Sequence, residues 1–190
     1  MKVSIILGSV REGRKTHRVA HHLVKLLDAQ PGVETLLMDL ESYDLPLLKD
    51  RWEEQVPVNP VLAEFSARLK SSDALIFVSP EYHGSYTGVL KNAVDHFWTE
   101  FSRKPIGVVA TGAGKFGGIN ASTEMQLLIL SLGAFPMPYK LLVPNVNKIF
   151  ASDDMPLDEQ FEKSVDKFVS EFLWFAGALA KAKKPVLSQK

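Results

Sequence analysis

The sequence predicts an open, doubly wound α/β fold, in which a five-stranded parallel sheet of order 2-1-3-4-5 carries helices on both faces. Short runs of β-branched and apolar residues recur along the chain, as in strands that are covered on both sides. Segments with apolar residues three and four positions apart lie between these runs, so strands and helices alternate. The 190 residues, 46% hydrophobic and 23% charged, suit one domain with a sizeable core.

Five segments have the pattern of buried parallel strands. Each is short, largely apolar and bounded by Gly, Pro, Asp or Ser, which commonly end strands. The predicted strands cover residues 3–7, 34–38, 74–79, 105–110 and 140–143. Right-handed crossovers join such strands into an open sheet, and five strands suit the order 2-1-3-4-5.

Helical periodicity fills the intervals between these strands. Apolar side chains at helical spacing would place one face of each helix on the sheet. The predicted helices cover residues 16–29, 60–71, 89–97 and 119–132. A Pro-rich connection of residues 40–59 exceeds what the alternating pattern needs.

The C-terminal tail is expected to be a long amphipathic helix over about residues 156–182. Asp153 or Asp154 would cap its start, ahead of Pro156. Such a helix would close the sheet, and the charged residues 183–190 are expected to form a frayed end. The whole chain is therefore predicted to be a single domain.

Charge and cysteine content exclude several classes of function. Lys plus Arg and Asp plus Glu each number 22, so no net charge attracts the chain to nucleic acid or to an anionic membrane, and neither partner is expected. Cysteine is absent, which excludes disulfides and thiol nucleophiles and favours a cytoplasmic location. The N-terminal apolar run is too short for a signal peptide or a membrane span.

The loop after the first strand has the composition of an anion site, at the edge of the sheet where open α/β folds bind ligands. Its sequence, GSVREGRKT, combines flexible glycines with Arg11, Arg14 and Lys15. The hydroxyls of Ser9 and Thr16 and the amides at the start of the next helix would face the same anion. The loop indicates a phosphate site; the alternative is a helix start with solvated basic side chains.

Other chemical patterns are incomplete. Arg14 separates Gly13 from Lys15, which breaks the spacing of a nucleotide-hydrolysing P-loop. The segment GAGKFG matches G-x-G-x-x-G, but no acidic residue follows at the end of the next strand to hold a ribose. We therefore interpret it as a turn that lets a flat ring approach the backbone. His17 and His21 have metal-binding spacing without a third ligand, so no metal site is expected.

The loop after the third strand carries planar side chains. In SPEYHGSYTG, Pro80 stiffens the exit from the strand and Tyr82 and His83 present rings. Opposite a glycine-rich loop, these residues would form the walls of a slot for a planar heterocycle. A plain surface loop is the alternative.

These segments together resemble the flavodoxin-like NADPH-dependent FMN reductases, a family that includes bacterial and fungal quinone, azo-dye and chromate reductases. The resemblance covers about residues 1–145. It consists of GSVREGR in the first loop, SPEYHGSYTGVLKNAVD in the third, and TGAGKFGG followed by a helix and LGA. The middle segment is the most specific, because the family is similar to PEYNG followed by a small-residue turn and LKNA.

The resemblance implies an FMN site made of three groups of residues. The group that would hold the phosphate is Ser9, Arg11, Arg14 and Thr16. The group that would border the isoalloxazine ring and the ribityl chain is Pro80, Glu81, Tyr82 and His83. The group that would face the pyrimidine edge of the ring is Thr111, Gly112, Gly114 and Phe116.

This chain differs from the usual family sequence at three positions in the first and third loops. His83 stands where Asn is usual, and Thr87 stands where Pro is common. Arg14 stands where Ser is frequent, so it either contacts the phosphate differently or faces solvent.

The resemblance implies an oxidoreductase in which bound FMN accepts a hydride from NADPH or NADH and passes two electrons to a small acceptor, such as a quinone, an azo compound or a free flavin. No catalytic side chain is needed, because the flavin carries the chemistry. The alternative is a flavodoxin-type electron carrier that binds FMN without NAD(P)H turnover, although the basic loop and neutral charge disfavour it. A third possibility is a dinucleotide-binding domain without flavin, and only the segment GAGKFG supports it.

The resemblance also implies a homodimer or homotetramer that completes each flavin site across an interface. Trp98, Phe97 and Phe101 are candidates for this contact, and packing in the core is the alternative for them.

Overall fold

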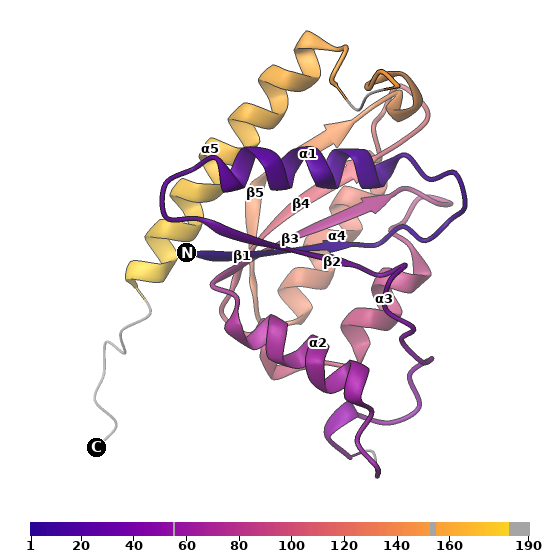
Figure 1. Ribbon diagram of the computed structural model, residues 1–190, viewed down its shortest axis with the longest axis vertical. Coiled ribbons are helices and arrows are strands. Elements are labelled where there is room, and N and C mark those ends of the chain that lie inside the picture. Colours follow the sequence, from indigo (N-terminus) through magenta and orange to yellow (C-terminus); the bar gives the residue numbers. More distant parts are fainter. Residues whose placement is uncertain (55, 153–154, 183–190) are drawn as a thin grey trace.

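The computed structural model describes residues 1–54, 56–152 and 155–182, and it has the predicted architecture. Five parallel strands form one sheet of order β2-β1-β3-β4-β5, between two layers of helices (Figure 1). The strands are β1 (Lys2–Leu7), β2 (Glu34–Asp39), β3 (Ala74–Pro80), β4 (Pro105–Thr111) and β5 (Phe135–Val143). The predicted fold class and strand order are confirmed.

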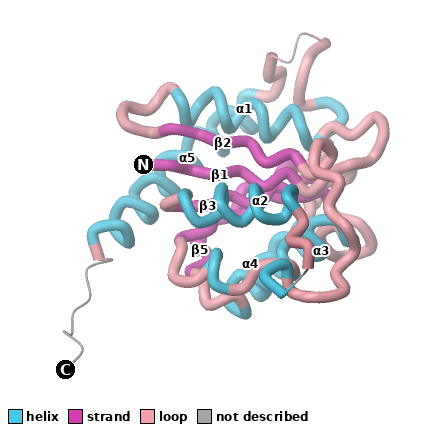
Figure 2. Tube along the Cα trace, turned by 60° about the horizontal axis from the view of Figure 1, so that its bottom comes forward, coloured by secondary structure: helices cyan, strands magenta, loops and turns pink. Residues whose placement is uncertain are grey.

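The helices divide between the two faces of the sheet (Figure 2). The α-helices are α1 (Thr16–Asp28), α2 (Pro60–Ser71), α3 (Gly88–Asp95), α4 (Ile119–Ser131) and α5 (Glu159–Lys181). Helices α1 and α5 pack on one face, and α2, α3 and α4 pack on the other. Along β1, Val3 and Ile5 belong to the first of these cores and Ile6 to the second. Strands covered in this way have apolar residues at nearly every position, as the sequence shows.

Strand β5 is longer than predicted. It begins at Phe135 rather than at Lys140, and its first half contains Pro136 and Pro138. It is the edge strand beside β4, where a residue without an amide proton is tolerated because no further strand needs that donor. The prolines therefore conceal the strand from a sequence pattern. They also coincide with a bulge, because the pairing with β4 shifts register between Ile106–Pro136 and Val108–Lys140.

Helix α5 begins at Glu159, three residues after the predicted start. The Asp158 side chain accepts a hydrogen bond from the Phe161 amide at 2.9 Å and caps the helix. The predicted caps, Asp153 and Asp154, lie outside the described residues, as does the predicted frayed end at 183–190. The helix packs on β4 and β5, as expected of the element that closes the sheet.

Close contact between α5 and β4 requires a residue without a side chain. A Cβ atom at Gly107 would lie 2.9 Å from Cζ of Phe168 and 3.0 Å from Cδ2 of Phe172. The two rings stack at 6.1 Å, directly over this glycine.

Among the described residues, no helix combines the length and apolar content needed to cross a bilayer.

The long connection before α2 is tied to α3. The Asn92 side chain donates to the Pro46 carbonyl at 2.9 Å and accepts from the Leu48 amide at 3.0 Å. Further along, the Trp52 indole donates to Glu100 at 3.2 Å. These bonds hold a segment with little regular structure against the helical layer.

Two of the three aromatic residues considered for a subunit contact lie in the core. Phe97 stacks on Phe65 at 5.2 Å, and both Phe97 and Phe101 are fully buried. Trp98, which lies three residues beyond the end of α3, is 63% exposed. Core packing, the alternative for these residues, therefore holds for the two phenylalanines, and a subunit contact through Trp98 stays a prediction.

Candidate functional site

The loops at the carboxyl edge of the sheet enclose a cleft of about 230 Å³. It brings together nine of the twelve expected cofactor residues, from three loops that are far apart in the sequence. The cleft is lined by Ser9, Arg11, Arg14, Lys15, Thr16, Pro80, Glu81, Tyr82, Thr111, Gly112, Ala113, Val146 and Asn147.

The first loop leaves polar groups without partners in this cleft. Ser9 is 1% exposed, and its buried hydroxyl has no hydrogen-bond partner among the described residues. Arg11 and Lys15 are exposed, and neither cation is paired within the described part of the chain. Lys15 occupies the N-cap position of α1 without a side-chain capping bond, and the first turn contains no acidic residue. This end of the cleft therefore has hydrogen-bond donors without acceptors among the described residues, and it is positively charged. Both properties suit the binding of an anion.

Arg14 also lines the cleft, but carboxylates hold its guanidinium. Nη1 donates to Oδ1 of Asp39 at 2.7 Å, and Nη2 donates to Oδ2 at 2.6 Å. Glu41 and the Ser9 carbonyl accept further hydrogen bonds from the same group. The hydrogen bond with Asp39 is the main cause that raises the pKa of Arg14 above its ordinary value.

Buried hydroxyl groups connect the loops. Oγ1 of Thr16 lies 2.8 Å from Oγ1 of Thr111, which joins the first loop to the end of β4. The Thr87 hydroxyl donates to the Gly8 carbonyl at 2.6 Å and accepts from the Leu90 amide at 3.3 Å, so Thr87 also caps α3. A Cβ atom at Gly8 would lie 2.8 Å from Cβ of Leu90, which explains the glycine at this crossing. Thr87 thus makes contacts that the more common Pro could not make, because Pro has no hydroxyl.

Glu81 connects the third loop to α4. Its Oε2 accepts from the amides of Asn120 at 2.9 Å and Ala121 at 3.0 Å. The N-cap residue of α4, Gly118, has a φ of 82° and provides no side-chain cap. Glu81 therefore satisfies amides of the first turn from another loop and places negative charge at the positive end of the helix.

Three expected residues lie outside the residues that line the cleft: His83, Gly114 and Phe116. Phe116 is 67% exposed, and among the described residues only its chain neighbours lie within 4 Å of a Cβ atom built on Gly114. His83 and Gly84 form a two-residue turn closed by mutual backbone hydrogen bonds between Tyr82 and Ser85. Because both central residues have positive φ, 51° and 79°, this is a type I′ turn, for which Asn-Gly is preferred.

Lys15, expected from the composition of the first loop although not from the resemblance, also lines the cleft, and the structure adds three residues that were not expected there: Ala113, Val146 and Asn147. The last two follow β5. The Val146 amide donates to the Gly112 carbonyl at 3.0 Å, and the Gly112 amide donates to the Val143 carbonyl at 3.0 Å. These bonds bring the fifth loop to the cleft, and the rule that ligands bind at carboxyl ends would have included it.

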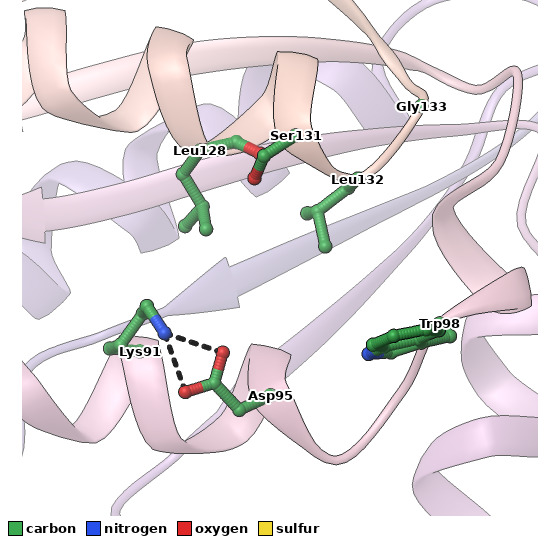
Figure 3. Close-up of a pocket in the computed structure, with 7 residues that line it drawn as sticks. All are labelled: Lys91, Asp95, Trp98, Leu128, Ser131, Leu132 and Gly133. Atoms are coloured by element: carbon green, nitrogen blue, oxygen red, sulfur yellow. Dashed lines mark hydrogen bonds and ion pairs between the residues drawn. The ribbon is translucent and has the colours of Figure 1, made fainter.

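A larger groove of about 410 Å³ lies elsewhere, between α3 and α4 (Figure 3). One wall carries the Lys91–Asp95 ion pair, and the opposite wall carries Leu128 and Leu132. The groove is formed by the C-terminal parts of both helices, which lie toward the amino edge of the sheet because each helix returns from the carboxyl edge. Its position and its satisfied charges distinguish it from a cofactor site of this fold.

A doubly wound sheet with an electropositive loop, a rigid loop bearing Tyr82 and a glycine-rich loop at one edge defines the flavodoxin-like class of proteins that bind a phosphorylated planar cofactor. Residues 1–148 match the NADPH-dependent FMN reductases, and the chain belongs to this family. It is therefore an oxidoreductase that depends on FMN and NAD(P)H.

Individual relatives agree with this assignment. The chain is 29% identical over 189 residues to the FMN-dependent NADPH-azoreductase of Staphylococcus haemolyticus, covering 92% of this chain and 95% of that protein. A quinone reductase of Pseudomonas putida is 29% identical over 177 residues, covering 90% and 91% of the two chains. The structure of the flavoenzyme NAD(P)H:(acceptor) oxidoreductase FerB of Paracoccus denitrificans is similar, with a TM-score of 0.81 at 26% identity, covering 93% of this chain and 97% of that one.

Proposed function

We propose that the cleft binds FMN with its phosphate on the first loop and its ring between the third and fourth loops. The observation that carries this proposal is the buried Ser9 hydroxyl, which lines the cleft and has no hydrogen-bond partner within the described part of the chain. A buried hydroxyl without a hydrogen bond is costly, and a phosphate oxygen would satisfy it. Arg11 and Lys15, exposed and unpaired among the described residues, supply the positive charge that a dianionic phosphate needs.

The other walls suit a flat ring. Pro80 and Tyr82 of the third loop and Gly112 and Ala113 of the fourth loop all line the cleft. A Cβ atom at Gly112 would lie 3.0 Å from the Gly118 amide nitrogen, so the close loop packing requires glycine there. When bound, FMN supplies the redox chemistry, accepting a hydride from NAD(P)H and delivering two electrons to an acceptor. The task of the protein is to hold and orient this cofactor.

We propose planar, two-electron acceptors, namely quinones, azo compounds or free flavin, as the second substrates. The azoreductase and quinone reductase names of the relatives support this class. The exposed side chain of Tyr82 lies at the rim, where such a ring could stack. The test compares kcat/KM of FMN-loaded protein for a soluble quinone, an azo dye and free FMN, with saturating NADPH or NADH. We expect turnover of at least one; rates equal to those without protein for all three would contradict the proposal.

We also propose that a second copy of the chain packs on α3 and α4. Helix α4 buries Met125 and Ile129 but also exposes Leu127 and Leu130, and a helix that is apolar on both sides normally has a partner on both. The cleft of about 230 Å³ is smaller than typical enclosed ligand sites of about 300–1,000 Å³, so an added subunit could cover the part of the ring beyond the rim.

The oligomer is tested by light scattering coupled to size-exclusion chromatography. The wild type is expected to have at least twice the mass of the 21.1 kDa chain, and Leu127→Glu with Leu130→Glu is expected to reduce it to a monomer. Trp174→Glu, at an exposed aromatic residue on α5, is the matched control and should leave the mass unchanged. A monomeric wild type at micromolar concentration would contradict this proposal.

The cytoplasmic location remains a prediction, which cell fractionation tests.

A further inference from the structure

Arg14 faces the proposed phosphate end of the cleft, yet its charge is already compensated. Its side chain is 12% exposed and that of Asp39 is 17% exposed, so this bidentate ion pair is largely shielded from water. Glu41 adds a second carboxylate. The group of Arg14, Asp39 and Glu41 has one positive and two negative charges, and its net charge is unfavourable to an anion. Turning Arg14 toward a phosphate would leave the half-buried Asp39 without its partner.

The contacts of Arg14 instead define the shape of the first loop. Its guanidinium donates to the Ser9 carbonyl, and its backbone amide donates to the Arg11 carbonyl at 3.0 Å. Asp39 is the last residue of β2, so the side chain of Arg14 anchors the loop to the end of a strand. One residue therefore holds both Ser9, whose hydroxyl is unsatisfied, and Arg11, whose cation is unpaired among the described residues.

We propose that Arg14 is a positioning residue rather than a phosphate ligand: it holds the first loop on Asp39 and Glu41, so that Ser9, Arg11 and Lys15 can meet the phosphate. This inference rests on the proposed flavin site. It assigns a separate role to an arginine that the family resemblance places among the phosphate ligands.

Riboflavin distinguishes the two roles, because it has the ring and ribityl chain of FMN but no phosphate. The dissociation constants of both flavins are measured by quenching of flavin fluorescence. A phosphate ligand affects FMN only, whereas a residue that holds the loop affects both flavins. For Arg11→Gln we expect FMN affinity to fall about tenfold or more, with riboflavin affinity nearly unchanged. For Arg14→Leu we expect both affinities to fall by similar factors.

Two further variants extend the test. Arg14→Leu with Asp39→Leu replaces the ion pair by apolar side chains, and it is expected to recover only part of the riboflavin affinity lost in Arg14→Leu, because the Ser9 carbonyl still lacks its donor. Arg14→Lys keeps the charge but cannot form the bidentate pair, so it should also weaken both flavins. A loss confined to FMN in Arg14→Leu, or normal FMN binding by Arg14→Lys, would overturn the proposal.

Hydrogen exchange of the flavin-free protein provides a readout that does not depend on the cofactor. Peptides spanning residues 8–18 should exchange faster in Arg14→Leu than in the wild type, and unchanged exchange would overturn the positioning role. If wild-type protein binds neither flavin, the proposed function fails, while the exchange result still decides whether Arg14 holds the loop. The two failures are therefore distinguishable.

Discussion

Oε2 of Glu81 lies 2.9 Å from the amide nitrogen of Asn120, so a carboxylate from the loop after β3 caps the helix that follows β4. This bond spans 39 residues and fixes two walls of the cleft relative to each other. Glu81, which the resemblance places beside the cofactor, thus also has a structural role as the cap of α4.

Replacing Glu81 by Ala should destabilise the protein by about 1–2 kcal/mol, because the first turn of α4 loses its capping acceptor and the favourable charge at its N-terminus. Urea unfolding measures the change. Glu81→Gln should cost less, since an amide oxygen still accepts a hydrogen bond. Glu124→Gln, on the exposed face of the same helix, is the control and is expected to stay within about 0.5 kcal/mol. Equal stability of Glu81→Ala and the wild type would show that the cap is unimportant.

Ser9→Ala should have opposite effects on stability and on cofactor binding. Without FMN, removing a buried hydroxyl that has no partner among residues 1–54, 56–152 and 155–182 should leave stability unchanged or raise it by up to about 1 kcal/mol. With FMN, loss of a hydrogen bond to the phosphate should weaken binding about tenfold. Thermal unfolding with and without saturating FMN measures both effects. A variant that loses stability without FMN and binds FMN normally would remove Ser9 from the phosphate site.

His83→Asn should raise stability by about 0.5 kcal/mol, because Asn adopts the left-handed conformation of this turn more readily than most residues. FMN affinity should stay the same, since His83 is exposed and lies outside the cleft lining. Gly84→Ala is the companion variant. Apart from its chain neighbours, no described residue has an atom within 4 Å of the added methyl group, so the expected loss of about 1 kcal/mol would come from the backbone alone. A large loss of FMN binding in His83→Asn would assign the imidazole a direct role.

The regular elements were largely predictable because their signals are local. The bounds of α2 were predicted in full, because its apolar residues have helical spacing over residues 60–71. Strand β5 was underestimated because Pro136 and Pro138 are acceptable only at an edge, and edge position is a property of the sheet. The local sequence pattern therefore predicts an element less well where the element's bounds depend on its position in the sheet.

The candidate site likewise has residues that the local sequence predicts and contacts that depend on the tertiary structure. Residue type and position after a strand identified Ser9, Arg11 and Tyr82 as residues of one cleft. The pairing of Arg14 with Asp39 was not visible, because it joins residues 25 positions apart and depends on the register of β1 and β2. The preference for Asn at position 83 is explained by backbone conformation, which a sequence reveals only when the turn type is known.

Glu100 should make stability depend on pH below about 4.5. It is 2% exposed, and burial opposes its ionisation, but hydrogen bonds from Ser66 and the backbone and the ammonium of Lys70 outweigh burial and hold its pKa below the ordinary value. A depressed pKa in the folded state stabilises the protein above the unfolded-state pKa, and this contribution disappears as pH falls through the folded-state value.

Glu100→Gln should therefore lower the unfolding free energy by about 1.5–3 kcal/mol at pH 7, and the difference from the wild type should shrink at pH 3–4. Urea unfolding at both pH values checks the sign. Glu171→Gln, at an exposed position on α5, serves as the control. A difference that grows at low pH would mean that Glu100 is stabilised in its protonated form.

The central claim is that this chain holds FMN at the carboxyl edge of its sheet and transfers electrons to it from a nicotinamide nucleotide. The most direct measurement is the visible absorbance of FMN-loaded protein mixed anaerobically with NADPH or NADH. We predict rapid loss of the flavin absorbance and its recovery on addition of one equivalent of quinone. Bound flavin that stays oxidised would indicate an electron carrier of flavodoxin type, and failure to bind FMN would contradict the assignment of the cleft.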